Sequence, residues 1–171
     1  MGISGSLGKK QVELKARSKA ALASAQFIST GFGLGYLPLA PGTWASAAAA
    51  VFWYAVYQLP IPHLFIFHLV AVGLLIPIAW ISGSVFSDHL RSKDPSIIVI
   101  DEILGQSFCY LFIPLNAAYF IAGFLLFRLF DIVKPPPARQ AERLQSGLGI
   151  MLDDLVAGFY AGALIWLFHA S

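Results

Sequence analysis

Long apolar stretches, separated by short polar links, dominate this sequence from residue 44 onward. The stretches run from Trp44 to Leu59, from Leu64 to Ser82, from Ile103 to Phe127 and from Leu155 to Phe168. The third stretch contains Pro114 and Asn116, residue types that favour a turn. We therefore expect it to be divided into two segments, which gives five apolar segments in all.

The composition indicates what surrounds these segments. The chain is 58% hydrophobic and 12% charged, whereas a soluble domain usually has about 25% charged residues. No Asp, Glu, Lys or Arg occurs from Ala20 to Ser87, so lipid is the expected solvent. Lipid offers backbone groups no hydrogen-bond partners, which favours helices. The prediction is an all-α fold, a polytopic membrane bundle of about five apolar helices with a short amphipathic N-terminal segment.

The N-terminus is basic, with five Lys or Arg residues among the first nineteen positions. The small residues from Ala21 to Ala25 resemble a signal cleavage site, but a cleaved signal needs an apolar region of about 7–15 residues before that site, and none precedes it. We expect residues 1–19 to form a basic cytoplasmic tail that contacts anionic lipid headgroups. Residues 20–171 are expected to form a single membrane-embedded domain.

The charges in the links predict an orientation. Besides the N-terminal tail, the links 83–96 and 132–149 contain Lys and Arg, whereas the links 59–63 and 114–117 and the tail 169–171 contain none. The positive-inside rule assigns the basic side to the cytoplasm. The same topology places most of the acidic residues there: Asp88, Asp94, Asp101, Glu102, Asp131, Asp153 and Asp154. A net charge of +2 gives no indication of a nucleic-acid partner.

Five of these acids lie within about a turn of three predicted helix ends, namely Asp101, Glu102, Asp131, Asp153 and Asp154. Acids at helix N-termini also favour the helix dipole without any ligand. This explains Asp101, Glu102, Asp153 and Asp154 individually, but it explains neither Asp131 nor the occurrence of two adjacent acidic pairs. Five converging carboxylates need a cation, and oxygen ligands select Mg²⁺, Mn²⁺ or Ca²⁺. We therefore predict a metal site formed by these five residues.

Basic residues flank the same acids. Arg128, Asp131 and Lys134 are spaced three apart, so they share one helical face or its end. Arg grips phosphate oxygens through two donors, and Lys acts as a point charge. Arg139 and Arg143 are explained equally well as ordinary cytoplasmic loop residues. We predict that Arg128 and Lys134 bind a phosphate group.

The segment 30–43, TGFGLGYLPLAPGT, precedes the first apolar segment. Glycines let backbone N–H groups approach an anion closely, and the N-terminus of the following helix attracts phosphate. The segment is neither a Walker loop nor a dinucleotide fingerprint, and a stiff re-entrant loop is an equally good interpretation. The candidate phosphate-binding residues here are Thr30, Gly31, Gly33 and Thr43.

Four blocks together resemble one family, phosphatidylglycerophosphatase A. The blocks are GFGLGYLPLAPGT at 31–43, DEILGQ at 101–106, RLFDIVKPPP at 128–137 and GLGIMLDDLVAG at 147–158. The resemblance implies a bacterial inner-membrane enzyme, with its active site on the cytoplasmic side. It also implies Mg²⁺-dependent removal of phosphate from phosphatidylglycerol phosphate to give phosphatidylglycerol. The five carboxylates named above match the acidic residues of the family.

The resemblance leaves the chemistry open. Either a metal-activated water attacks phosphorus, with one Asp as general base, or an Asp attacks and forms an aspartyl-phosphate. A cation or phosphate transporter is the alternative from a different class, although transporters favour midplane charges and inverted repeats. A phosphatase for another lipid or prenyl phosphate is also possible. Phosphatidyltransferases and histidine-based lipid phosphatases need sequence blocks that this chain lacks.

Overall fold

In the part of the chain that the computed structural model describes, residues 3–92, 95–136, 138 and 147–171, all regular structure is helical. Its side chains are described except at positions 3–14, 16, 147, 148 and 150. The α-helices in these described ranges are α1 (Ile3–Ser29), α2 (Pro41–Tyr57), α3 (Leu64–Leu90), α4 (Ile100–Cys109), α5 (Ala117–Val133) and α7 (Gly147–Ala170), and a short 3-10 turn, η1, covers Leu34–Tyr36. The predicted all-α class is confirmed.

Each of the five apolar segments contains a helix, but the ends differ from the apolar boundaries. The division at Pro114 and Asn116 is confirmed, since the Asn116 side chain accepts a hydrogen bond of 2.8 Å from the Ala118 N–H and caps α5. Helix α3 continues beyond Ser82 to Leu90. Near its end the Ser82 hydroxyl donates to the Ile78 carbonyl at 2.6 Å, and the Ser87 hydroxyl donates to the Ser92 carbonyl beyond the helix at 2.6 Å.

Two of the described helices are long and apolar enough to cross a membrane, Leu64–Leu90 and Met151–Ala170. Helices α2 and α5 have 17 residues each, and α4 has only 10. Ten residues rise about 15 Å, half of the roughly 30 Å hydrocarbon core. Large apolar side chains are nevertheless exposed on all the longer helices, such as Val51, Phe65, Ile121 and Phe168. The outer surface therefore suits lipid, while the predicted number of five membrane segments stays a prediction.

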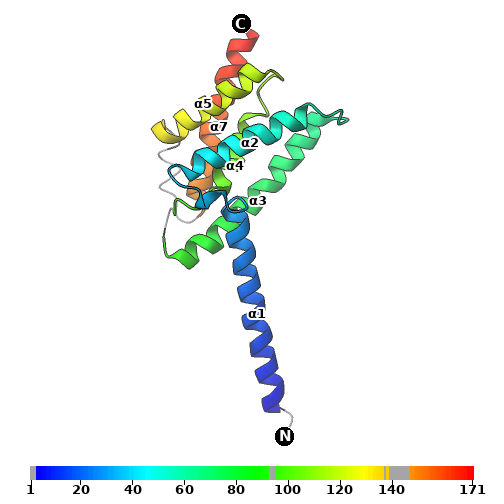
Figure 1. The fold of residues 1–171 in the computed structure, drawn as a ribbon, viewed down its shortest axis with the longest axis vertical. Coiled ribbons are helices and arrows are strands. Elements are labelled where there is room, and N and C mark those ends of the chain that lie inside the picture. Colours follow the sequence, from blue (N-terminus) through cyan, green and yellow to red (C-terminus); the bar gives the residue numbers. More distant parts are fainter. Residues whose placement is uncertain (1–2, 93–94, 137, 139–146) are drawn as a thin grey trace.

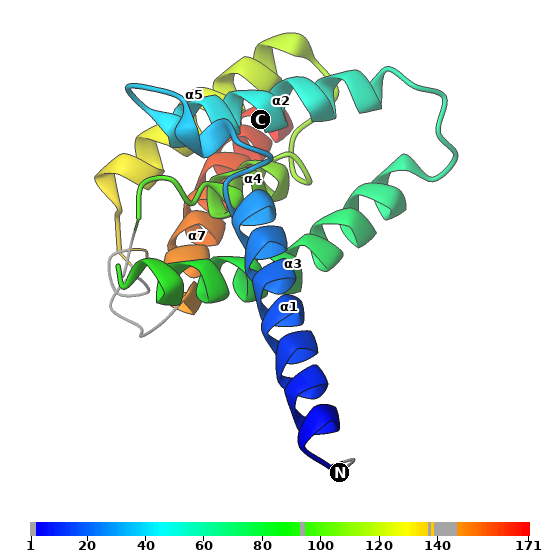
Figure 2. The same ribbon diagram turned by 60° about the horizontal axis from the view of Figure 1, so that its bottom comes forward.

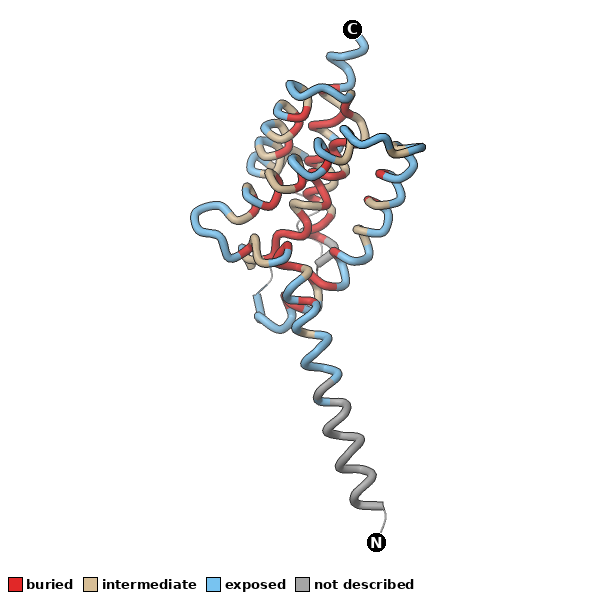
Figure 3. Tube along the Cα trace, turned by 45° about the vertical axis from the view of Figure 1, so that its right-hand side comes forward, coloured by how far each residue is buried: buried red, intermediate tan, exposed pale blue. Residues whose placement is uncertain are grey.

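Helix α4 lies at the centre of the bundle, surrounded by the other helices of residues 41–171 (Figures 1 and 3). Glycines bring it close to α7. A Cβ atom at Gly105 would lie 2.6 Å from the Asp154 carbonyl oxygen, and one at Gly158 would collide with the Gly105 carbonyl. This backbone contact places the first turn of α4 beside the start of α7.

The N-terminal helix is longer than the short segment that we expected. Helix α1 has 27 residues and continues through the predicted boundary after residue 19. Residues 9–29 contain no Gly or Pro and are rich in Ala, Lys and Gln, which favour helix. Only its last turns pack on the bundle, with Ala25 and Ser29 buried, and the rest projects away (Figures 1 and 2).

Candidate active site

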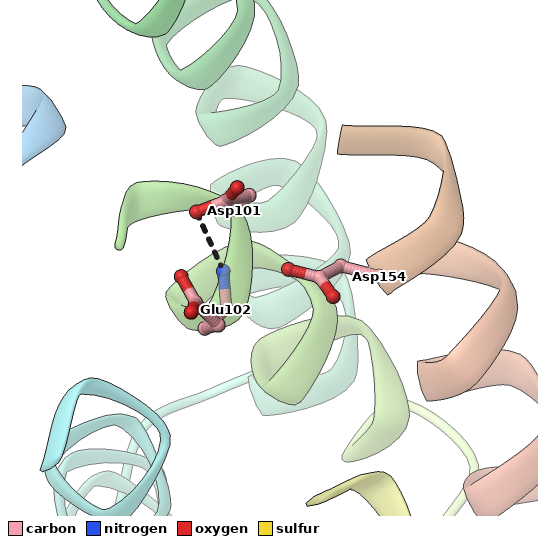
Figure 4. A group of neighbouring side chains, drawn as sticks. All are labelled: Asp101, Glu102 and Asp154. Atoms are coloured by element: carbon pink, nitrogen blue, oxygen red, sulfur yellow. Dashed lines mark hydrogen bonds between the residues drawn. The ribbon is translucent and has the colours of Figure 1, made fainter. Parts of the chain in front are cut away.

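Three carboxylates meet at the contact between α4 and α7. Asp101 and Glu102 lie in the first turn of α4, and Asp154 lies near the start of α7. Each offers an oxygen atom within 4.8 Å of the other two. Figure 4 shows the three side chains directed toward one another, with the Glu102 N–H donating to Asp101 Oδ1 at 3.2 Å. We call Asp101, Glu102 and Asp154 the carboxylate cluster.

The start of α4 is held by the segment that follows α1. The Val99 N–H donates to the Ser29 carbonyl at 2.9 Å. Gly31 has a positive φ of 56°, and a Cβ atom there would lie 2.9 Å from Ile103 Cδ1. The turn after α1 therefore packs directly on α4 and positions Asp101 and Glu102.

The N-terminus of α2 lies against Glu102. A Cβ atom at Gly42 would overlap Glu102 Oε1 and would lie 3.2 Å from Arg128 Nη1. Because Gly42 is in the first turn of α2, the positive end of that helix dipole faces the Glu102 carboxylate. A glycine is required here by space, since any side chain would displace the carboxylate.

The two other predicted acids stand beside the carboxylate cluster in ion pairs. Asp131 Oδ2 lies 2.7 Å from Arg128 Nη1, and Asp153 Oδ2 lies 2.7 Å from Lys134 Nζ. Asp153 also accepts a hydrogen bond of 3.1 Å from the Asp154 N–H. The structure thus brings all five predicted carboxylates, with Arg128 and Lys134, to one end of the bundle.

The cluster is buried and electrostatically strained. Asp101 is 7% and Asp154 3% exposed. Burial raises the pKa of the Glu102 carboxyl well above its ordinary value, and the charges of Asp101 and Asp131 add to the increase. Glu102 Oε2 and Arg128 Nε are buried without a hydrogen-bond partner among the described residues. A buried carboxylate oxygen without a partner, among other carboxylates, fits a hard cation.

The backbone N–H groups of the glycine-rich segment make local hydrogen bonds. The backbone N–H groups of residues 30–37 all donate to carbonyls within residues 26–34. Thr30 is buried, and its hydroxyl donates to the Phe27 carbonyl at 3.3 Å. The Thr43 N–H donates to the Ala40 carbonyl. Thr30 and Gly31 are buried, and Gly33 has a positive φ of 97° in the turn. The phosphate-binding role of Thr30, Gly31, Gly33 and Thr43 stays a prediction. Arg139 and Arg143 lie outside the described residues.

Two polar residues that the sequence did not single out lie near the predicted ones. The Ser46 hydroxyl is 3.5 Å from Arg128 Nη1 and donates to the Gly42 carbonyl at 2.8 Å. Gln106 is fully buried one turn after Glu102, with both amide atoms unpartnered among the described residues. Gln106 is four residues after Glu102, a spacing that places both side chains on one helical face and could have predicted its position. Ser46 lies in an alanine-rich run, where no sequence pattern indicates a functional role.

Comparison with known proteins gives a consistent result. The family model described as Phosphatidylglycerophosphatase A matches residues 27–169. A Bacteroides thetaiotaomicron protein named "Putative phosphatidylinositol-3-phosphatase" is 39% identical over 141 residues, which cover 81% of this chain and 89% of the relative. The Escherichia coli protein named Phosphatidylglycerophosphatase A is 35% identical over 150 residues, covering 83% and 82%. The Haemophilus influenzae protein of that name is 34% identical over 141 residues, covering 81% and 85%. No solved structure matches.

Proposed function

Because this chain belongs to the phosphatidylglycerophosphatase A family, we propose that it hydrolyses the phosphomonoester of phosphatidylglycerol phosphate, giving phosphatidylglycerol and phosphate. The observation that carries this proposal is the buried carboxylate cluster with Arg128 and Lys134 beside it. That combination suits an anionic substrate whose hydrolysis depends on a cation.

The proposed cofactor is Mg²⁺. Asp101, Glu102 and Asp154 would hold it, with Asp131 and Asp153 as neighbouring carboxylates. All of these donors are hard oxygen atoms, and Glu102 Oε2 is a buried oxygen that a cation would satisfy. When bound, Mg²⁺ supplies Lewis-acid stabilisation of phosphate oxygens and a more acidic water.

The chain's own side chains bind the substrate and move the proton. Arg128 and Lys134 bind the phosphate oxygens. Their ion pairs with Asp131 and Asp153 hold these two basic side chains at the site. One carboxylate accepts the proton of the attacking water. In the alternative route, an Asp attacks phosphorus and water then hydrolyses the aspartyl-phosphate. Single-turnover incorporation of oxygen-18 into an enzyme carboxylate distinguishes the two.

The membrane placement is part of the proposal. Residues 20–171 form one membrane-embedded domain whose five apolar segments each pass between the two membrane faces, and α3 and α7 are long enough to span the hydrocarbon core as single helices. The exposed apolar side chains of the longer helices support this placement. The carboxylate cluster lies on the cytoplasmic side with the basic tail 1–19, so the lipid headgroup reaches the site while its tails stay in the bilayer.

A second lipid phosphate is a candidate substrate because of the name of one relative. The Bacteroides thetaiotaomicron protein is named for a phosphatidylinositol 3-phosphatase activity and is 39% identical over 141 residues. Because of this name, phosphatidylinositol 3-phosphate is the alternative substrate to test.

An assay of phosphate release distinguishes the two substrates. The purified full-length protein is given each lipid in matched mixed micelles, with Mg²⁺ or with a chelator. We expect Mg²⁺-dependent release with a kcat/KM at least about tenfold higher for phosphatidylglycerol phosphate. A higher value for phosphatidylinositol 3-phosphate would overturn the proposed substrate. No release from either lipid would overturn the phosphatase proposal for this chain.

A further inference from the structure

A groove lies between α2 and α5. It measures about 350 Å³, within the usual range of ligand sites. Its lining is apolar apart from the Tyr54 hydroxyl: Ala47, Ala50, Val51, Tyr54, Ala117, Phe120, Ile121 and Phe124. Small side chains at Ala47, Ala50 and Ala117 leave the space open.

Contacts at two levels show that α2 and α5 run in opposite directions along the groove. Ser46 approaches Arg128 at 3.5 Å, and the rings of Tyr54 and Phe120 are 5.4 Å apart. The second contact is eight residues later along α2 and eight earlier along α5. The lining from Ala47 to Tyr54 extends about 10 Å at the helical rise of 1.5 Å per residue.

One end of the groove reaches the candidate active site. Phe124 is one turn before Arg128 on α5, and Ala47 follows Ser46, which contacts Arg128. The buried Arg128 Nε has no hydrogen-bond partner among the described residues. A positively charged guanidinium group thus stands at the end of a narrow hydrocarbon surface.

We propose that this groove binds an acyl chain of the phospholipid substrate while its phosphate lies at Arg128 and the carboxylate cluster. The inference rests on the proposed function and adds a second binding site to it. The occupant is a hydrocarbon chain because the lining offers almost no hydrogen-bond partner and because the space is elongated along the helices. Exposed Val51 and Ile121, 70% and 62% accessible, border the groove where it opens toward lipid.

The test fills the end of the groove that is far from the site. Ala117→Trp and Ile121→Trp place an indole in the lining, whereas Ala118→Trp and Leu125→Trp alter exposed positions of the same helix outside it. Each full-length variant is assayed with dioleoyl and with dihexanoyl phosphatidylglycerol phosphate in matched micelles. The readout is the ratio of kcat/KM for the long-chain lipid to that for the short-chain lipid.

We expect the ratio to fall at least about tenfold in both groove variants, equivalent to losing about two buried methylene groups, and to stay at the wild-type value in both controls. An unchanged ratio in folded groove variants overturns the inference. The inference is also overturned if the wild-type protein is a dimer and the groove variants become monomeric with an unchanged ratio. In that case the groove is occupied by a helix of a second copy of the chain. A wild-type protein that hydrolyses neither lipid overturns the proposed function itself, a result distinct from both.

Discussion

At the scale of single residues, the fold holds the three side chains of the carboxylate cluster close together despite the repulsion between their negative charges. Glu102 lies beside Asp101 and Asp154, and Gly42 in the first turn of α2 packs against both Glu102 and Arg128. Repulsion between buried carboxylates destabilises the folded state unless a cation offsets it. The sequence predicted which acids would matter, because they lie at the ends of apolar segments. It did not predict that Gly42 must lack a side chain to admit Glu102.

Removal of the Glu102 charge tests whether the cluster binds a cation. We expect wild-type protein to melt at a higher temperature when Mg²⁺ is added, because a ligand of the native state stabilises it. Glu102→Gln should lose most of that increase and should melt higher than wild type in chelator, since one buried like charge is gone. Thermal melting in detergent measures both effects. Asp88→Asn, an exposed position, should behave as wild type, and an equal Mg²⁺ response in Glu102→Gln contradicts the metal site.

Gln106 offers a different test, because it carries two buried amide atoms that lack partners among the described residues. Such a group costs about 1–3 kcal/mol. Gln106→Met should therefore raise the free energy of unfolding while lowering phosphatase activity, if the amide holds a water or substrate oxygen below Glu102. Gln58→Met, at an exposed glutamine after α2, is the control. Lower stability with full activity would show that Gln106 is only a packing residue.

At the scale of helices, the apolar pattern predicted the positions of all five described helices from α2 to α7, but it did not predict where each helix begins and ends. Helices α3 and α7 extend past the apolar runs, to Leu90 and back to Gly147. In the extension of α3, Ser87 is buried whereas Asp88 and His89 are exposed, so the helix continues after its apolar run has ended. The convergence of the two acidic pairs depends on the glycine contact between α4 and α7, a tertiary feature that a one-dimensional pattern does not contain.

The glycine contact predicts a difference between two conservative substitutions. Gly105→Ala should destabilise the protein by about 1–3 kcal/mol, because its Cβ atom would meet the Asp154 carbonyl and Phe127 at 2.6 and 2.7 Å. Gly73→Ala in α3 meets nothing within 4 Å and should stabilise by up to about 1 kcal/mol. Denaturation in detergent measures both, and equal effects would contradict the close packing of α4 on α7.

At the scale of the whole molecule, the links and tails determine orientation, and the two termini lie at opposite ends of the structure (Figure 1). The basic tail and the loop after α3 belong to the predicted cytoplasmic side, whereas the C-terminus carries no Lys or Arg. Family comparison supports the phosphatase class but not the side of the membrane. Charge bias alone carries that prediction.

Labelling with a membrane-impermeant maleimide tests the orientation. The native Cys109 is buried and should stay unlabelled. In spheroplasts, Ser171→Cys should react from outside, whereas Ser92→Cys in the loop after α3 should react only after the membrane is opened. The reverse pattern would place the carboxylate cluster on the outer side.

We propose that the carboxylate cluster is the Mg²⁺-dependent site of phosphate release. The most direct measurement is kcat for phosphatidylglycerol phosphate at saturating Mg²⁺ in purified wild type, Asp101→Asn, Asp154→Asn and the exposed control Asp88→Asn. Both cluster variants should lose about 100-fold or more while the control keeps wild-type activity. Full activity in folded Asp101→Asn and Asp154→Asn would contradict the claim.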